Sequence, residues 1–90
     1  MMIRVDGTTS QYAAAKAALA VHAKRAGWPP RTPVQIRFYR TDVGSSPRAF
    51  TGLFDGRCVI ALDVSLDELG VYDHCKQAIN DLVAKLKEHS

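Results

Sequence analysis

The dipeptide Asp55-Gly56 constrains the fold of this 90-residue chain more than any other feature. It joins two segments of alternating character, residues 48–54 and 57–63. A two-residue type I′ turn needs positive φ at both central positions, which Asp-Gly tolerates, so the pattern predicts a β-hairpin. In such a hairpin Phe50 and Phe54 are expected to share the apolar face of the second segment. That face consists of Cys58, Ile60 and Leu62.

Residues 34–41 form a third alternating segment. Val34, Ile36 and Phe38 point one way, and Gln35, Arg37 and Tyr39 point the other way. This period of two is typical of a half-buried antiparallel strand. Residues 3–5, in which Ile3 and Val5 flank Arg4, add a short edge strand. We therefore expect an antiparallel meander of residues 34–41, 48–54 and 57–63, bordered by residues 3–5.

Two helices are expected, over residues 10–26 and 66–88. Eight of the seventeen residues in the first are alanine, the best helix former, and Gly27 suits a left-handed stop. Each helix follows a capping-box pattern, Thr8 with Gln11 and Ser65 with Glu68. The second helix carries an apolar stripe at helical spacing, which is expected to supply much of the core. The stripe consists of Leu69, Tyr72, Ile79, Leu82, Val83 and Leu86.

These elements predict one α+β domain spanning residues 1–90. The order is β-α-β-β-β-α, with an antiparallel sheet of three to four strands and two helices on one face. An apolar fraction of 47% and a charged fraction of 23% are ordinary for a globular protein. No signal peptide or membrane-length apolar run is present, so a cytoplasmic location without membrane contact is expected. The two cysteines, Cys58 and Cys75, are interpreted as buried free thiols.

No sequence motif identifies a family. The order of elements resembles that of double-stranded-RNA-binding domains and of ribosome hibernation-promoting factors. The hibernation factors also resemble this chain in having a close hairpin followed by a long terminal helix. Here the hairpin is Phe54-Asp55-Gly56-Arg57, and the helix includes residues 78–86. Both families imply an RNA-directed function. The chain departs from the double-stranded-RNA binders at Ser65-Leu66-Asp67-Glu68, which is acidic where their second helix begins with lysines.

Residue types that support catalysis occur without a catalytic arrangement. Asp73, His74 and Cys75 are consecutive on the second helix, where neighbours point about 100° apart and cannot form a relay. The histidines and cysteines lack the paired spacing of a metal site, and there is no glycine-rich phosphate loop. We therefore expect no enzyme activity, no metal and no cofactor.

Charge is unevenly divided along the chain. Residues 1–41 contain seven basic residues and one acid, a net charge of +6, whereas residues 42–90 contain five basic residues and eight acids, a net charge of −3. Such asymmetry is typical of a chain with an acidic partner. The alternative is that the two halves interleave in space and neutralise each other.

The basic half also contains a cluster of arginine and aromatic residues. Arginine binds phosphate and an aromatic ring stacks on a base, so this cluster suits nucleic acid. Trp, Tyr and Arg are equally the usual hot-spot residues of protein interfaces, and Trp28 has the further role of closing one end of the core. The predicted binding residues are Arg25, Trp28, Arg31, Arg37, Tyr39 and Arg40.

The expected function is that of a small binding module with a basic surface for an acidic macromolecule. That partner is RNA, DNA or an acidic protein surface, with RNA or a ribonucleoprotein favoured by the order of elements. The alternative is a small protein-binding inhibitor or accessory factor of the kind that phages and mobile elements direct at host complexes. A homodimer is compatible with either function.

Overall fold

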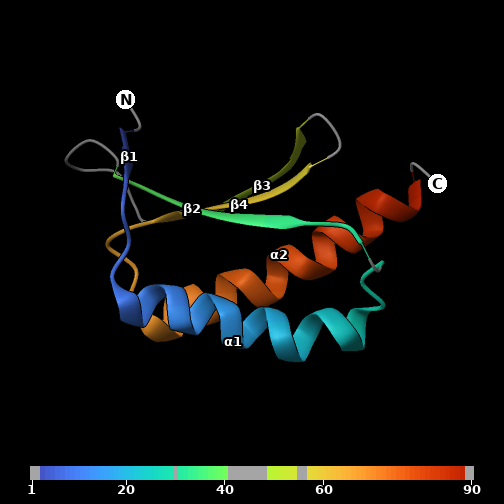
Figure 1. Ribbon diagram of the computed structural model, residues 1–90, viewed down its shortest axis with the longest axis horizontal. Coiled ribbons are helices and arrows are strands. Elements are labelled where there is room, and N and C mark those ends of the chain that lie inside the picture. The colour runs from blue at the N-terminus through green and yellow to red at the C-terminus, as the bar shows by residue number, and fades with distance from the viewer. Residues whose placement is uncertain (1–2, 30, 41–48, 55–56, 89–90) are drawn as a thin grey trace.

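The computed structural model describes residues 3–29, 31–40, 49–54 and 57–88, and its elements follow the expected order (Figure 1). The elements are β1 (Ile3–Val5), α1 (Thr9–Ala26), β2 (Val34–Arg40), β3 (Ala49–Phe54), β4 (Arg57–Asp63) and α2 (Glu68–Glu88). The turn predicted at residues 55–56 lies outside the described residues. The strands that this turn would join, β3 and β4, do pair antiparallel, with Phe54 opposite Arg57.

The sheet is mixed, and the expected antiparallel meander is therefore wrong. The strand order is β1-β2-β4-β3, so β2 borders β4 rather than β3. β2 and β4 run parallel, in register from Val34 opposite Cys58 to Tyr39 opposite Asp63, while β1 and β3 are the antiparallel edges. β4 is buried along most of its length on both faces. A strand of that kind belongs in the centre of a sheet, and it takes that place here between β2 and β3.

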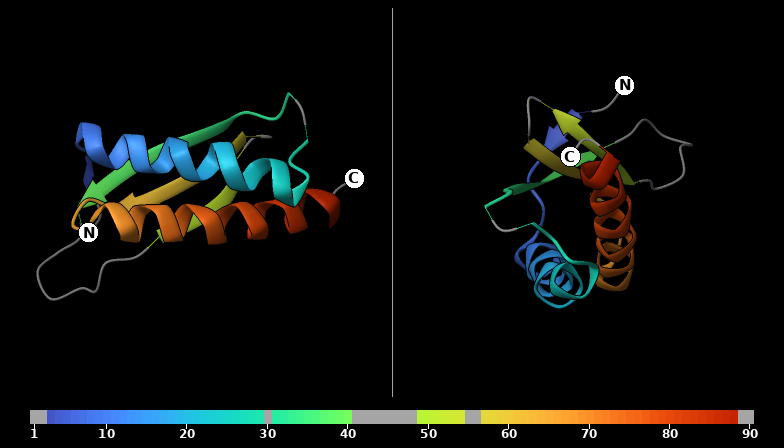
Figure 2. Two further views of the ribbon diagram at one scale, coloured as in Figure 1. Left: turned by 90° about the horizontal axis from the view of Figure 1, so that it is seen from below. Right: turned by 90° about the vertical axis from the view of Figure 1, so that its right-hand side faces the viewer.

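Both helices pack against one face of the sheet, as expected, and they run in the same direction (Figures 1 and 2). Their first turns lie at the end of the sheet near β1, and their last turns lie at the opposite end. The helix-facing residues of β2 and β4 meet small residues of α1 and the apolar face of α2. The core cluster consists of Ala15, Ala18, Phe38, Cys58, Ile60, Leu62, Val71, Cys75, Ala78 and Leu82.

The first capping box is confirmed, and its glutamine has a second role. The Gln11 backbone N–H donates to Thr8 Oγ1 at 3.1 Å, and Thr8 N–H donates to Gln11 Oε1 at 2.8 Å. The other end of the same amide, Nε2, donates to the carbonyl oxygens of Val64 at 2.7 Å and Leu66 at 2.9 Å. Gln11 is only 7% exposed. This one side chain therefore attaches the start of α1 to the segment that connects β4 and α2.

The second helix begins differently from its predicted capping box. Ser65 donates through its backbone N–H and its hydroxyl group to Asp63 Oδ1, and Asp67 Oδ1 accepts from the Gly70 N–H at 2.7 Å. Asp67 is thus the cap, and the helix starts at Glu68. The predicted stripe also starts too early, because Leu69 is 78% exposed. The buried face comprises Val71, Cys75, Ala78, Ile79, Leu82 and Val83.

Gly7 connects β1 to α1 at a point where only glycine fits. A Cβ atom at this position would lie 2.5 Å from the Phe38 ring. That ring is buried and in edge-to-face contact with Tyr12, at a centroid distance of 4.9 Å, so it has no free space to move into. Glycine at position 7 therefore lets the chain pass over the Phe38 ring and places Tyr12 against it.

Both cysteines are buried free thiols, as expected. Burial raises the pKa of the Cys75 thiol to about 11 and also raises the pKa of Cys58. Each side chain is therefore uncharged at neutral pH and serves as a small apolar core residue. Among the described residues, no helix has the length and apolar character needed to cross a membrane.

Candidate functional site

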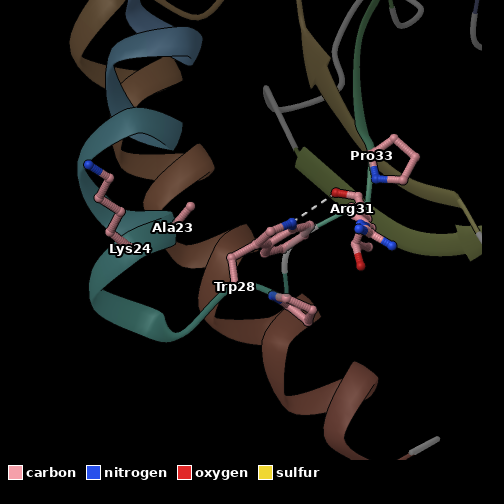
Figure 3. A pocket seen from close by; sticks show the side chains of 7 residues that line it. Ala23, Lys24, Trp28, Arg31 and Pro33 are labelled. Carbon is pink, nitrogen blue, oxygen red and sulfur yellow. Dashed lines mark hydrogen bonds between the residues drawn. The ribbon is translucent and has the colours of Figure 1, made fainter.

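Three of the six predicted binding residues lie at the end of α1 and in the connector to β2. Arg25 is exposed in the last turn of the helix. Gly27 ends the helix in the expected left-handed conformation, with φ 78°. Trp28 then packs partly against the core, while its indole Nε1 donates to the Thr32 carbonyl at 2.9 Å (Figure 3). Trp28 thus closes this end of the core, and Arg31 extends from the exposed side of the connector.

The connector lines an open hollow of about 550 Å³ (Figure 3). Arg31 in this hollow has φ 68°, a left-handed backbone conformation that residues other than Gly and Asn rarely adopt. Strain of this kind is concentrated at functional positions. The lining residues are Ala23, Lys24, Trp28, Pro29, Arg31, Thr32 and Pro33.

The other three predicted residues lie on β2, and they do not join the first three in one patch. Arg37 and Tyr39 face away from the helices, on the face of the sheet that no described helix covers (Figure 1). Arg40 is exposed at the last residue of the strand. A strand rises about 3.3 Å per residue, so Arg40 lies about 20 Å from Val34 at the connector end. The predicted cluster therefore divides into a connector group and a sheet group.

The sheet group gains two residues that the sequence pattern did not assign to it. Phe50 pairs with Ala61, which pairs with Arg37, so these three residues form one row across the uncovered face. The prediction that Phe50 faces the core is wrong, and the side chain of Phe54 is outside the described residues. Arg4 pairs with Tyr39 and so lies on the same face. The pairing register decides both placements, and no local signal in the sequence reports it.

Tyr39 and Phe50 form an aromatic pair that reaches across β4. Their ring centroids are 5.8 Å apart and the ring planes are tilted by 34°. Tyr39 is 4% exposed whereas Phe50 is 44% exposed. The buried tyrosine ring thus contacts the phenylalanine ring, and Phe50 presents an aromatic surface to solvent.

Arg37 has an incompletely satisfied guanidinium group. Its Nη2 donates to Gln35 Oε1 at 3.0 Å, two residues earlier on the same face. Its Nε is buried and has no hydrogen-bond acceptor among the described residues. Buried donors are nearly always paired in folded proteins, so this Nε is an exception, and only the rest of the guanidinium group is open to a ligand.

The arginines of the first half are not paired with acids of the second half in the part of the chain that the structure describes. The two halves do interleave, since β2 lies beside β4 and both helices pack on one face. Among the described residues, nevertheless, Arg4, Arg25, Arg31, Arg37 and Arg40 form no ion pair with a carboxylate. Spatial interleaving therefore leaves the positive charge of these arginines available to a partner.

The side chains with catalytic potential are not assembled into a site. Asp73 is exposed, His74 is half-buried and Cys75 is in the core, as their consecutive positions on a helix require. His22 and Tyr72 join α1 to α2, with His22 Nε2 and Tyr72 Oη 3.0 Å apart. Within the part of the chain that the structure describes, no three histidine, cysteine or acidic residues are grouped to hold a metal.

Comparisons with protein-family models, with curated proteins and with solved structures found no match to this chain. Its functional interpretation therefore depends on the geometry and charge of the two groups described above.

Proposed function

We propose that this chain is a non-enzymatic binding module that presents a basic surface to an acidic macromolecule, with RNA or a ribonucleoprotein favoured over DNA. The observation that carries this proposal is the absence of carboxylate partners for the five described arginines of the first half. Arginines without a carboxylate partner provide charged donors for phosphate oxygens. The order of elements, which RNA-directed domains share, favours RNA.

The arrangement of the arginines supports a polyanion rather than a single small anion. The connector group and the sheet group lie apart on the surface, and Arg40 lies about 20 Å from the start of β2. A single phosphate or carboxylate ligand cannot contact all of them. A nucleic-acid backbone, which carries regularly spaced charges, can contact several of them along its length.

One observation favours a second function, that of a small protein-binding inhibitor or accessory factor. The connector hollow combines Trp28 and Arg31, residue types that dominate the binding energy of protein interfaces, with prolines that stiffen the backbone. A protein partner would insert a side chain into this hollow. Such a complex would resist nuclease treatment, whereas a complex bridged by RNA would not.

Binding to RNA is expected to depend steeply on salt. If about four phosphates of a duplex are contacted, the log–log slope of affinity against salt is near −3.6, and affinity falls roughly a hundredfold between 50 and 200 mM. Removing three arginines should flatten this slope, because fewer counterions are released. We suggest Arg37→Ala and Arg40→Ala with Arg31→Gly, since glycine retains the left-handed backbone at position 31. Fluorescence anisotropy with mixed-sequence RNA and DNA measures the slope.

A charge-matched control comes from the second half of the chain. Arg57, Lys76 and Lys85 are all exposed, and their replacement by alanine removes the same formal charge. The control should leave most of the slope intact and should melt within a few degrees of the parent, since exposed charges contribute about 1 kcal/mol or less. The arginine variant should also keep its fold, with an added cost of about 1 kcal/mol for the lost hydrogen bond between Arg37 and Gln35. Absence of nucleic-acid binding at 50 mM salt would contradict the proposal and favour the protein-binding alternative.

A further inference from the structure

We infer that the uncovered face of the sheet binds an unpaired nucleotide of a single strand, with its base stacked on Phe50 and a phosphate oxygen accepting from Arg37. This inference rests on the proposed function and specifies the form of nucleic acid that the module takes. It does not involve the connector group, which has no aromatic ring facing solvent as fully as Phe50 does.

The first step of the inference is the stacking surface. Phe50 is the most exposed aromatic ring among the described residues and lies on the edge strand β3, on the uncovered face. The ring of its neighbour Tyr39 contacts it at a centroid distance of 5.8 Å. A ring that is held in place and open on one side offers a platform for a base, and such stacking accepts any base because every base has a π face.

The second step is the position of Arg37 relative to this platform. Arg37 and Phe50 occupy one row of the sheet, separated only by Ala61. Neighbouring strands are about 4.8 Å apart, so the backbones of Arg37 and Phe50 are about 10 Å apart. Because the side chain of Ala61 is small, it does not project between the side chains of Arg37 and Phe50. A nucleotide lying across this row would place its base and its phosphate at the two ends.

The third step is the chemistry of the arginine. Its buried Nε has no acceptor among the described residues, while Nη2 is held by Gln35 at 3.0 Å. The Gln35 contact thereby orients the guanidinium group. Because Nε is out of reach of solvent, a phosphate oxygen accepts from the Nη end of the half-buried side chain and matches the guanidinium charge. Arg4, exposed on the same face at the β1 edge, is placed to contact a neighbouring phosphate of the strand.

Asp63, the acid that the pairing of β2 with β4 places on this face, does not oppose such a ligand directly. Asp63 pairs with Tyr39 in the register, but it is buried, and its Oδ1 accepts two hydrogen bonds from Ser65. The surface that a ligand meets is therefore aromatic and basic. In a duplex the base faces are already stacked on each other, so only a single strand can offer a base to Phe50.

The experiment compares a short single strand with the same sequence in a duplex, using RNA and DNA versions of each. The unmodified protein is expected to bind the single strands at least about tenfold more tightly than the duplexes. Phe50→Ala should lose roughly tenfold or more of the single-strand affinity, the usual effect of removing one stacking ring. Phe50→Leu, which retains an apolar side chain without a π face, should lose a similar factor and tests for a general packing effect. Leu69→Ala removes an apolar side chain of α2 that is more exposed than Phe50, and it should change nothing.

The Arg37→Lys variant separates the effect of the guanidinium shape from the effect of its charge at the phosphate contact. Lysine retains the positive charge but not the planar guanidinium donors, so affinity should fall several-fold while the salt slope is retained. Equal binding of single strand and duplex, with Phe50→Ala unchanged, would overturn this inference and leave the proposed function standing. Binding to neither form at 50 mM salt would overturn both.

Discussion

Replacing Gln11 by glutamate is expected to destabilise the fold by about 3–5 kcal/mol, the cost of an uncompensated buried charge. The glutamine Nε2 donates to two carbonyl oxygens, of Val64 at 2.7 Å and Leu66 at 2.9 Å, in a buried position. A carboxylate of nearly the same shape would set a negative oxygen against both acceptors and leave them unpaired. A chain of this length has a total stability of roughly 5–13 kcal/mol, so the variant should be largely or partly unfolded.

Urea unfolding followed by circular dichroism measures this effect, and pH gives an internal check. Protonation of the introduced carboxyl group restores a donor, so the deficit relative to the parent should shrink as the pH falls. Thr8→Ala is the matched control, because it removes only the hydroxyl that accepts from the Gln11 N–H and should cost about 1 kcal/mol. A Gln11→Glu protein as stable as the parent at neutral pH would show that the amide contacts with the β4–α2 segment are not formed.

Leu82→Ala is expected to cost about 2–5 kcal/mol, the range for large-to-small changes in a packed core. Leu82 is fully buried in the cluster that α2 shares with the sheet and α1. Leu69 lies on the same helix and is 78% exposed, so Leu69→Ala makes the same chemical change with little loss of contacts. The leucine variants should therefore differ by several degrees or more in melting temperature. Equal melting temperatures would mean that α2 does not bury its apolar face in this domain.

Local signals in the sequence predicted the elements well, and long-range pairing accounts for the errors. The Asp-Gly dipeptide led to the correct antiparallel pairing, which the structure shows for residues 49–54 with residues 57–62, because a two-residue turn leaves no other partner. Nothing local indicates whether β2 joins the hairpin at β3 or at β4. Sequential strands are neighbours in most sheets, which favoured β3. The continuous burial of β4 was the contrary signal, since a strand that is apolar on both faces needs neighbours on both sides.

The candidate site was predicted to the extent that it depends on alternation within one strand. Arg37 and Tyr39 lie on the polar face of β2 as predicted, because the period of two needs no knowledge of the partner strand. Phe50 and Arg4 depend on which residues they oppose, and a shift of one residue moves a side chain to the other face. Gln11 shows the same limit in a helix. Its capping contact was predicted from its spacing to Thr8. Its hydrogen bond to the Val64 carbonyl joins residues 53 positions apart, and no local pattern indicates it.

The parallel pairing of β2 with β4 has a consequence for the order in which the chain folds. The β3–β4 hairpin closes at Phe54 and Arg57, whereas Val34 and Cys58 are 24 positions apart. Closing the longer loop costs more chain entropy, so the hairpin should form first and dock on β2 later. Destabilising substitutions in β2 should therefore mainly accelerate unfolding, and slowed refolding instead would reverse this order. Until β2 docks, β4 exposes an apolar strand edge, and this is the stage at which two chains can pair wrongly and aggregate.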